Sequence, residues 1–138
     1  MKHGRIIVDA NIAFRCLVAH RGDVRAQLMQ QSRAGLFTPR YLFVELFKHK
    51  QRIVTASRLP EDEVLEALYT LSSQLRFYNE SLIPFPVWTQ ALRLCGSIDE
   101  KDTPYVALTL HLDGCLWTQD EELKRGLRAR GFDRFFEP

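Results

Sequence analysis

Five acidic residues stand where folding alone does not require an acid: Asp9, Glu45, Asp99, Asp102 and Asp120. Two of them follow short apolar runs, one lies inside the apolar stretch 41–47, and two stand just before the apolar residues 105–108. A carboxylate in such a place loses hydration when the chain folds, and it then needs a compensating charge. A hard divalent cation bound through oxygen atoms supplies that charge. The pattern is therefore typical of a Mg²⁺ or Mn²⁺ site gathered from distant parts of the chain.

Each acid also has a structural explanation, which the sequence leaves open. Asp9, Asp102 and Asp120 each stand at the start of an expected helix, where a carboxylate can accept hydrogen bonds from free backbone N–H groups. Glu45 could instead be neutralised by one of three nearby basic residues: Arg40, Lys48 or His49. The order of these acids along the chain is a more specific sign of a metal site than any single acid. An Asp follows a strand, a Glu lies within a helix, an Asp precedes a helix, and a Thr-x-Asp sequence follows a second strand.

Polar and basic residues accompany the acids. Asn11 and Thr118 each stand two residues from an acid and could orient a carboxylate or a water molecule of the metal. The net charge of +2 is far from that of a constitutive duplex-binding protein, but basic residues gather around Glu45 and after Asp120. This clustering favours a phosphate-bearing substrate. The expected substrate contacts are four of these basic residues: Arg40, Lys48, Lys50 and Lys124.

The composition predicts a single domain over residues 1–138. Hydrophobic residues make up 46% and charged residues 26% of the chain, as is usual for a globular protein in water. No apolar run approaches the roughly 20 residues that span a bilayer, and the first residues do not form a signal peptide. We therefore expect a cytoplasmic protein with no membrane contact. The three cysteines have no close pair, which argues against a disulfide framework or a zinc site.

Strands and helices alternate in the expected secondary structure. Strands are expected at residues 4–8, 36–38 and 115–118, with an extended segment at 81–83 and a final edge strand at 132–136. Helices are expected at residues 10–19, 23–34, 40–56, 60–77, 87–95, 102–112 and 120–130. This alternation predicts a mostly parallel sheet covered on both faces. Ligands bind at the carboxyl ends of the strands in such sheets, and Asp9 and Asp120 fall at those ends.

The ordered acids resemble those of the PIN domain, a nuclease family that includes the toxins of VapBC-type toxin–antitoxin pairs. The matching pieces are Ile7 to Asn11, Pro39 to Glu45, Asp102 ahead of Val106-Ala107-Leu108, and Leu116 to Asp120. The resemblance runs from Ile6 to about Phe136, and parts of it are closer to a less-studied prokaryotic branch than to the common toxins. It implies a three-layer α/β/α sandwich around a mostly parallel sheet of about four or five strands.

The resemblance also implies an activity, namely Mg²⁺- or Mn²⁺-dependent hydrolysis of RNA phosphodiester bonds by an endoribonuclease. In this reading Asp9, Asp102 and Asp120 are metal ligands, Glu45 is a ligand or the catalytic base, and Asp99 is an additional acid. A divalent ion would offset the repulsion between the acids and the phosphodiester. A role as the toxin of a toxin–antitoxin pair, a protein antitoxin and a homodimer are further implications.

Three alternatives remain open at this stage. The chain could be a catalytically silent PIN-like module that binds RNA or a protein. It could be an aspartyl phosphotransfer enzyme with Asp9 as nucleophile, although Asn11 stands where the usual signature has a second Asp. It could also be a metal-free ribonuclease that uses His49 and His111, neither of which has an evident partner in the sequence. Titration with Mn²⁺ separates a nuclease of the expected kind from a pure binding module.

Overall fold

Four short strands form one parallel sheet in the computed structural model, which describes residues 4–18, 26–28, 30 and 35–138. The strands lie in the order β3-β2-β1-β4. Their bounds are Ile6–Val8 for β1, Leu36–Pro39 for β2, Arg76–Tyr78 for β3 and Cys115–Trp117 for β4. The all-parallel order confirms the predicted sheet.

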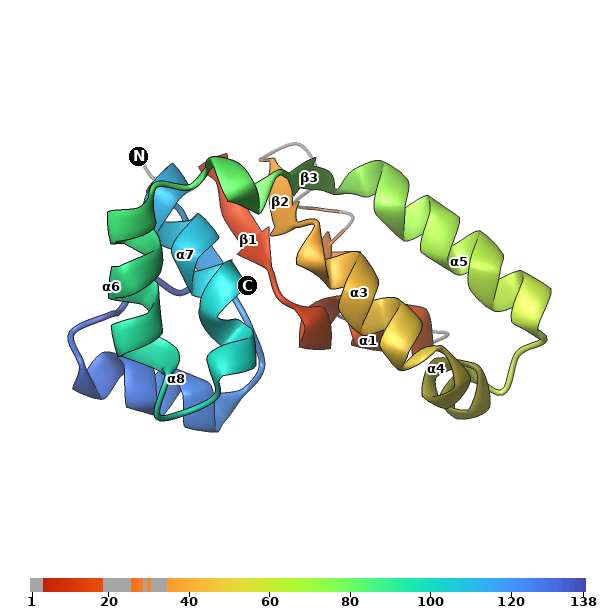
Figure 1. Ribbon diagram of the computed structural model, residues 1–138. Helices are drawn as coiled ribbons and strands as arrows, with labels where there is room; N and C mark the ends of the chain where they lie inside the picture. Colours follow the sequence, from red (N-terminus) through yellow and green to blue (C-terminus); the bar gives the residue numbers. More distant parts are fainter. Residues whose placement is uncertain (1–3, 19–25, 29, 31–34) are drawn as a thin grey trace.

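Helices pack on both faces of this sheet (Figure 1). One face carries α1 (Ala10–Val18), α3 (Tyr41–Lys48), α4 (Lys50–Ser57) and α5 (Glu61–Gln74). The other face carries α6 (Phe85–Cys95), α7 (Thr103–Leu112) and α8 (Glu121–Ala129). Short 3₁₀ turns, η3 (Glu80–Leu82) and η4 (Glu100–Asp102), precede α6 and α7. None of the helices within these described residues is long and apolar enough to cross a membrane.

The period-two alternation of the strands explains the two layers of helices. Ile6 and Val8 of β1 pack into the core beneath α1, α3, α4 and α5, whereas Ile7 packs into the core beneath α6, α7 and α8. In β4, Trp117 and Leu116 divide between the same two cores. Successive side chains of a strand point to opposite faces, so a strand of continuous apolar residues needs cover on both sides.

Parallel pairing brings the ends of β1 and β4 together. Val8 pairs with Trp117, and the backbone N–H of Asp9 donates a hydrogen bond to the Trp117 carbonyl at 3.3 Å. Asp9 and Thr118, which follow these strands, therefore lie at one edge of the sheet. This is the edge where ligands bind in parallel α/β folds.

The predicted helix at residues 40–56 is wrong in one respect, because it is two helices. The chain leaves helical geometry at His49, whose φ and ψ are −107° and 18°. α4 turns away from the axis of α3 there (Figure 1) and packs against α1 and α5. No glycine or proline marks the break, so packing rather than local sequence decides it.

The end of the predicted helix at residues 60–77 is also wrong. α5 stops at Gln74, Leu75 is extended, and Arg76–Tyr78 form the edge strand β3 beside β2. The aromatic residues of this segment have high strand propensity, and pairing with β2 outweighs the helical pattern before them.

Smaller differences concern three other segments. The segment expected to be extended at 81–83 begins as the 3₁₀ turn η3, and the Asn79 side chain accepts a hydrogen bond from the Ser81 N–H there. α6 begins at Phe85, two residues before the predicted start. The expected strand at 132–136 is reduced to a single parallel bridge between Leu116 and Phe135. Most of the helix predicted at 23–34 lies outside the described residues.

Candidate active site

Asp9 lies at the carboxyl end of β1 and is almost fully buried, with 3% of its surface exposed. One carboxylate oxygen accepts a hydrogen bond from the Ile12 N–H at 2.9 Å, so Asp9 caps α1. The Thr118 hydroxyl donates a second hydrogen bond to the same carboxylate. Thr118 therefore contacts the Asp9 carboxylate, and that carboxylate also caps α1.

Asp120 reaches the site from the loop that follows β4. Its backbone N–H donates to the Thr118 hydroxyl at 3.1 Å, and one carboxylate oxygen accepts from the Leu123 N–H at 3.0 Å. The carboxylate thus caps α8 through one oxygen. Because a carboxylate has two oxygens and about four acceptor positions, this cap leaves acceptor capacity for a cation.

Asp102 stands where η4 meets α7, at the N-terminal end of the helix. Unlike Asp9 and Asp120, it forms no capping hydrogen bond with its side chain. The capping explanation for this acid therefore fails, although its position in the sequence favoured it. Asp99 caps the preceding 3₁₀ turn by accepting a hydrogen bond from the Lys101 N–H at 3.0 Å.

Glu45 projects from α3 and is held by a residue that the sequence did not single out. The hydroxyl of Tyr105, on α7, donates to the Glu45 carboxylate at 2.6 Å. Tyr105 is 2% exposed, and burial together with the charge of Glu45 raises the pKa of its hydroxyl far above the usual range. Tyr105 therefore remains a hydrogen-bond donor at every physiological pH. The one feature of the sequence that could have indicated this contact is the tyrosine hydroxyl within the apolar segment after Asp102.

The carboxylates from these four segments interact electrostatically. Burial is the main cause that raises the pKa of Asp9 to about 6, and repulsion from Asp120 and Glu45 adds to it. Burial also raises the pKa of Asp102 to about 7, with repulsion from Asp99, Asp9, Asp120 and Glu45. The charges that raise the two pKa values are all carboxylates. The fold therefore brings Asp9, Glu45, Asp102 and Asp120 close enough for their charges to act on one another.

This region suits a hard divalent cation through the chemistry of its donors, which are carboxylate oxygens drawn from buried and half-buried positions. As the side chains stand, no three of the described His, Cys, Asp and Glu residues are close enough together to hold a metal ion. Carboxylate oxygens that repel one another fit a divalent cation. To coordinate the ion together, the acidic side chains would have to move closer to one another.

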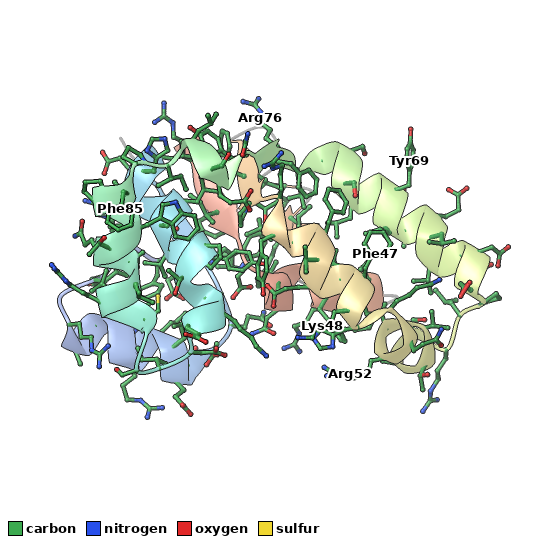
Figure 2. The ribbon with its side chains drawn as sticks, viewed as in Figure 1. Phe47, Lys48, Arg52, Tyr69, Arg76 and Phe85 are labelled. Carbon is green, nitrogen blue, oxygen red and sulfur yellow. The ribbon has the colours of Figure 1, made fainter. Side chains whose placement is uncertain are left out.

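Most of the basic residues expected to contact substrate are engaged elsewhere in the fold. Three ion pairs account for them: Arg40 with Glu80 at 3.2 Å, Lys50 with Glu61 at 3.4 Å, and Lys124 with Glu137 at 3.1 Å. Lys124 is 6% exposed and also pairs with Glu121 at 3.5 Å, so its ammonium group is engaged by two carboxylates. Lys48 is exposed, and Figure 2 shows it with Arg52 extending from the α3–α4 segment.

A cleft of about 370 Å³ adjoins the acids at Glu45. α1, the α3–α4 junction and the loop after β4 all contribute to its walls. Its polar lining, besides Glu45, consists of Asn11, Arg15, His49, Arg52 and Gln119. Asn11 and Gln119 are sequence neighbours of the acids, whereas Arg15 and Arg52 were not among the predicted site residues. His111, which the metal-free alternative paired with His49, does not line this cleft, and its Nε2 lies 2.8 Å from the Tyr78 hydroxyl.

Comparisons with known proteins agree with this architecture. The family model described as PIN domain matches residues 7–135. The crystal structure of VapBC2 from Rickettsia felis, bound to a DNA fragment from their promoter, contains a similar chain. The match has a TM-score of 0.67 and 15% identity, and it covers 88% of this chain and 92% of that one. No curated protein matches this chain. The predicted resemblance and the α/β/α sandwich are both confirmed.

Proposed function

Because this chain belongs to the PIN domain family, we propose that it is a divalent-metal-dependent endoribonuclease, which hydrolyses RNA phosphodiester bonds. One observation carries the proposal. Acids from the end of β1, from α3, from the start of α7 and from the loop after β4 perturb one another in a partly buried region. Folding stability alone gives no reason to gather these charges, since their repulsion opposes folding.

In this proposal Asp9, Asp102 and Asp120 hold Mg²⁺ or Mn²⁺, with Asp99 as an additional acid. Glu45 either joins them or accepts the proton of the attacking water. When bound, the ion supplies positive charge that attracts the phosphodiester, lowers the pKa of water and stabilises the leaving oxygen.

Three neutral side chains accompany these acids. Tyr105 keeps the carboxylate of Glu45 in place through its hydrogen bond. Thr118 does the same for Asp9. Asn11, two residues after Asp9, lines the adjoining cleft, where its amide can hold a water molecule or a substrate oxygen.

We further propose that the protein acts as the toxin of a toxin–antitoxin pair in the cytoplasm. The support is the similarity of its fold to a chain in the VapBC2 structure. A protein antitoxin would then inhibit it, and a homodimer would be its working form. Induction of the gene in a bacterial host should arrest growth. Growth that continues unchanged would argue against the toxin role, but it would not bear on the proposed ribonuclease activity.

The chemistry is tested by replacing single carboxylates with amides of the same shape. Asp9→Asn and Asp120→Asn should each abolish Mn²⁺-dependent cleavage of single-stranded RNA and weaken Mn²⁺ binding, while both variants stay folded. Gel analysis of end-labelled RNA measures cleavage, and calorimetry measures the binding of Mn²⁺.

Asp62→Asn is the matched control, because Asp62 is an exposed acid in the first turn of α5. Its variant should cleave like the unaltered protein. Cleavage that persists undiminished in either site variant would refute the assignment. RNA binding without cleavage by the unaltered protein, at any Mn²⁺ concentration, would instead favour a silent binding module.

A further inference from the structure

A carboxylate cluster repels the nucleotides on either side of the bond that it is to cleave. Each phosphate of a single strand carries a negative charge, and a cation at the acids offsets this charge only locally. A nuclease of the proposed kind therefore needs further positive groups beside the acids. The cleft at Glu45 is where the described part of the chain supplies them.

We propose that this cleft binds the RNA strand next to the cleaved bond, and that Arg15 and Arg52 contact its phosphates. The proposal rests on the proposed function and specifies where the substrate lies. The two arginines come from different helices, α1 and α4, yet line one cleft together with Glu45. A phosphate in the cleft would thus be reached by two guanidinium groups that the tertiary structure brings together.

Neither arginine is paired with a carboxylate in the described part of the chain. By contrast, Arg40, Lys50 and Lys124 each form such a pair. Glu45, the acid of the cleft, already accepts a hydrogen bond from the buried Tyr105.

The Arg52 guanidinium is also preorganised. Its central carbon lies 5.4 Å from the centre of the Phe14 ring, and Phe14 lines the same cleft. A guanidinium held against an aromatic face keeps its N–H groups available around its edge, where they can bind phosphate oxygens in pairs. Lysine cannot reproduce this planar contact.

The position of the cleft favours a nucleic acid over an acidic peptide. Glu45 lines the cleft itself, and Asn11 and Gln119 are sequence neighbours of Asp9 and Asp120, so a strand in the cleft would lie beside the acids. The volume of about 370 Å³ falls in the range of sites that enclose a small ligand. A single nucleotide unit with its phosphate is such a ligand. An acidic peptide that extended from the cleft would meet the carboxylates of the site and would be repelled by them.

The test measures binding without cleavage. The full-length protein in EDTA is titrated into fluorescent single-stranded RNA of about 12 nucleotides, and anisotropy reports the dissociation constant. The double variant Arg15→Ala/Arg52→Ala should bind about tenfold or more weakly at about 0.1 M salt. The slope of log affinity against log salt should fall by about 1.4, since each lost phosphate contact contributes about 0.7. Arg15→Lys/Arg52→Lys should recover only part of the affinity.

The control is Arg93→Ala/Arg125→Ala, which removes the same charge from exposed positions on α6 and α8. Equal losses in the two double variants, or no loss in either, would overturn the proposal. The proposal would also be overturned if Arg15→Ala/Arg52→Ala left the affinity for RNA unchanged but abolished the binding of a fluorescent oligoglutamate peptide. Because the assay contains no metal, its outcome is separate from that of the cleavage assay: an inactive protein can still show the cleft contact, and an active one can lack it.

Discussion

Asp9 and Asp102 show at the scale of single residues how the acids of the candidate site oppose folding. Both carboxyl groups have raised pKa values because of burial and neighbouring acids. A group whose pKa is higher in the folded protein binds protons more tightly there than in the unfolded chain. Folding stability therefore falls as the pH rises from about 4 through 6 or 7, where these groups lose their protons.

This linkage gives a prediction for the metal-free protein. In EDTA at about pH 8, Asp9→Asn should raise the free energy of unfolding by about 1–3 kcal/mol, and the gain should shrink towards pH 4, where Asp9 is protonated. Urea unfolding of both proteins at the two pH values measures the difference. A variant that is less stable than the unaltered protein at the higher pH would contradict this account of Asp9.

Tyr105 yields the second prediction at this scale. Tyr105→Phe removes the hydroxyl that holds Glu45 and leaves the ring in the core, so the variant should remain folded. A hydrogen bond to a charged group contributes about 1.5–3 kcal/mol. Part of this should appear as weaker Mn²⁺ binding and slower cleavage, which calorimetry and single-turnover kinetics measure.

The chain offers a matched control in Tyr78→Phe. That substitution removes the hydroxyl that contacts His111, and neither residue lines the cleft at Glu45. It should leave Mn²⁺ binding and cleavage unchanged. If Tyr105→Phe behaves like Tyr78→Phe in both assays, Tyr105 is a core residue without influence on the site. A loss of cleavage in the Tyr78 variant would reopen a role for His111.

Among the elements, the pairing of β1 with β4 matters most, because Asp9 and Thr118 follow these two strands. Gly114 immediately precedes β4, and a Cβ atom there would stand 2.5 Å from the Arg5 carbonyl oxygen and 2.8 Å from the Ile7 side chain. The Arg5 carbonyl belongs to the backbone, so it cannot move aside as a flexible side chain can. The close approach of the two strands therefore requires glycine at this position.

Gly114→Ala should consequently destabilise the protein by about 2 kcal/mol or more and lower its melting temperature. Gly126→Ala is the comparison, since the three atoms nearest to a Cβ there all belong to the Ile98 side chain, which can shift. Its effect should be clearly smaller. Thermal unfolding followed by circular dichroism distinguishes the two, and equal effects would mean that the β1–β4 contact tolerates an added methyl group.

The helices around the site show which elements local sequence can predict. α1, α7 and α8 were expected within one or two residues of their observed ends, because Asp9, Asp102 and Asp120 mark their starts and apolar spacing marks their length. The break at His49 and the strand β3 were missed. Both depend on packing against α5 or pairing with β2, which no pattern within a few residues records.

At the scale of the whole molecule, the acids connect segments that span most of the chain. A cation bound to Asp9, Glu45, Asp102 and Asp120 would tie together both layers of helices, since α3 and α7 pack on opposite faces of the sheet. Such binding stabilises the folded state only, because the unfolded chain holds the acids far apart.

Mn²⁺ should therefore raise the melting temperature of the unaltered protein. At 100 times the dissociation constant the expected stabilisation is about 2.7 kcal/mol. Asp9→Asn should remove most of the shift, and calorimetric scans with and without Mn²⁺ measure it. The same shift in the Asp9 variant would place the ion elsewhere, and no shift in the unaltered protein would argue against a metal site.

The amino-acid pattern alone was enough to indicate the PIN domain and the parallel sheet, and it also supplied the acids that we propose as the site. Strand propensity, helix starts and apolar periodicity act over a few residues, and the acids interrupt those patterns visibly. The hydrogen bond from Tyr105 to Glu45 spans 60 residues, and the cleft that unites Arg15 with Arg52 joins two helices. These contacts arise only when the layers pack, because the distances between remote side chains follow from the shape of the folded chain and not from its local preferences.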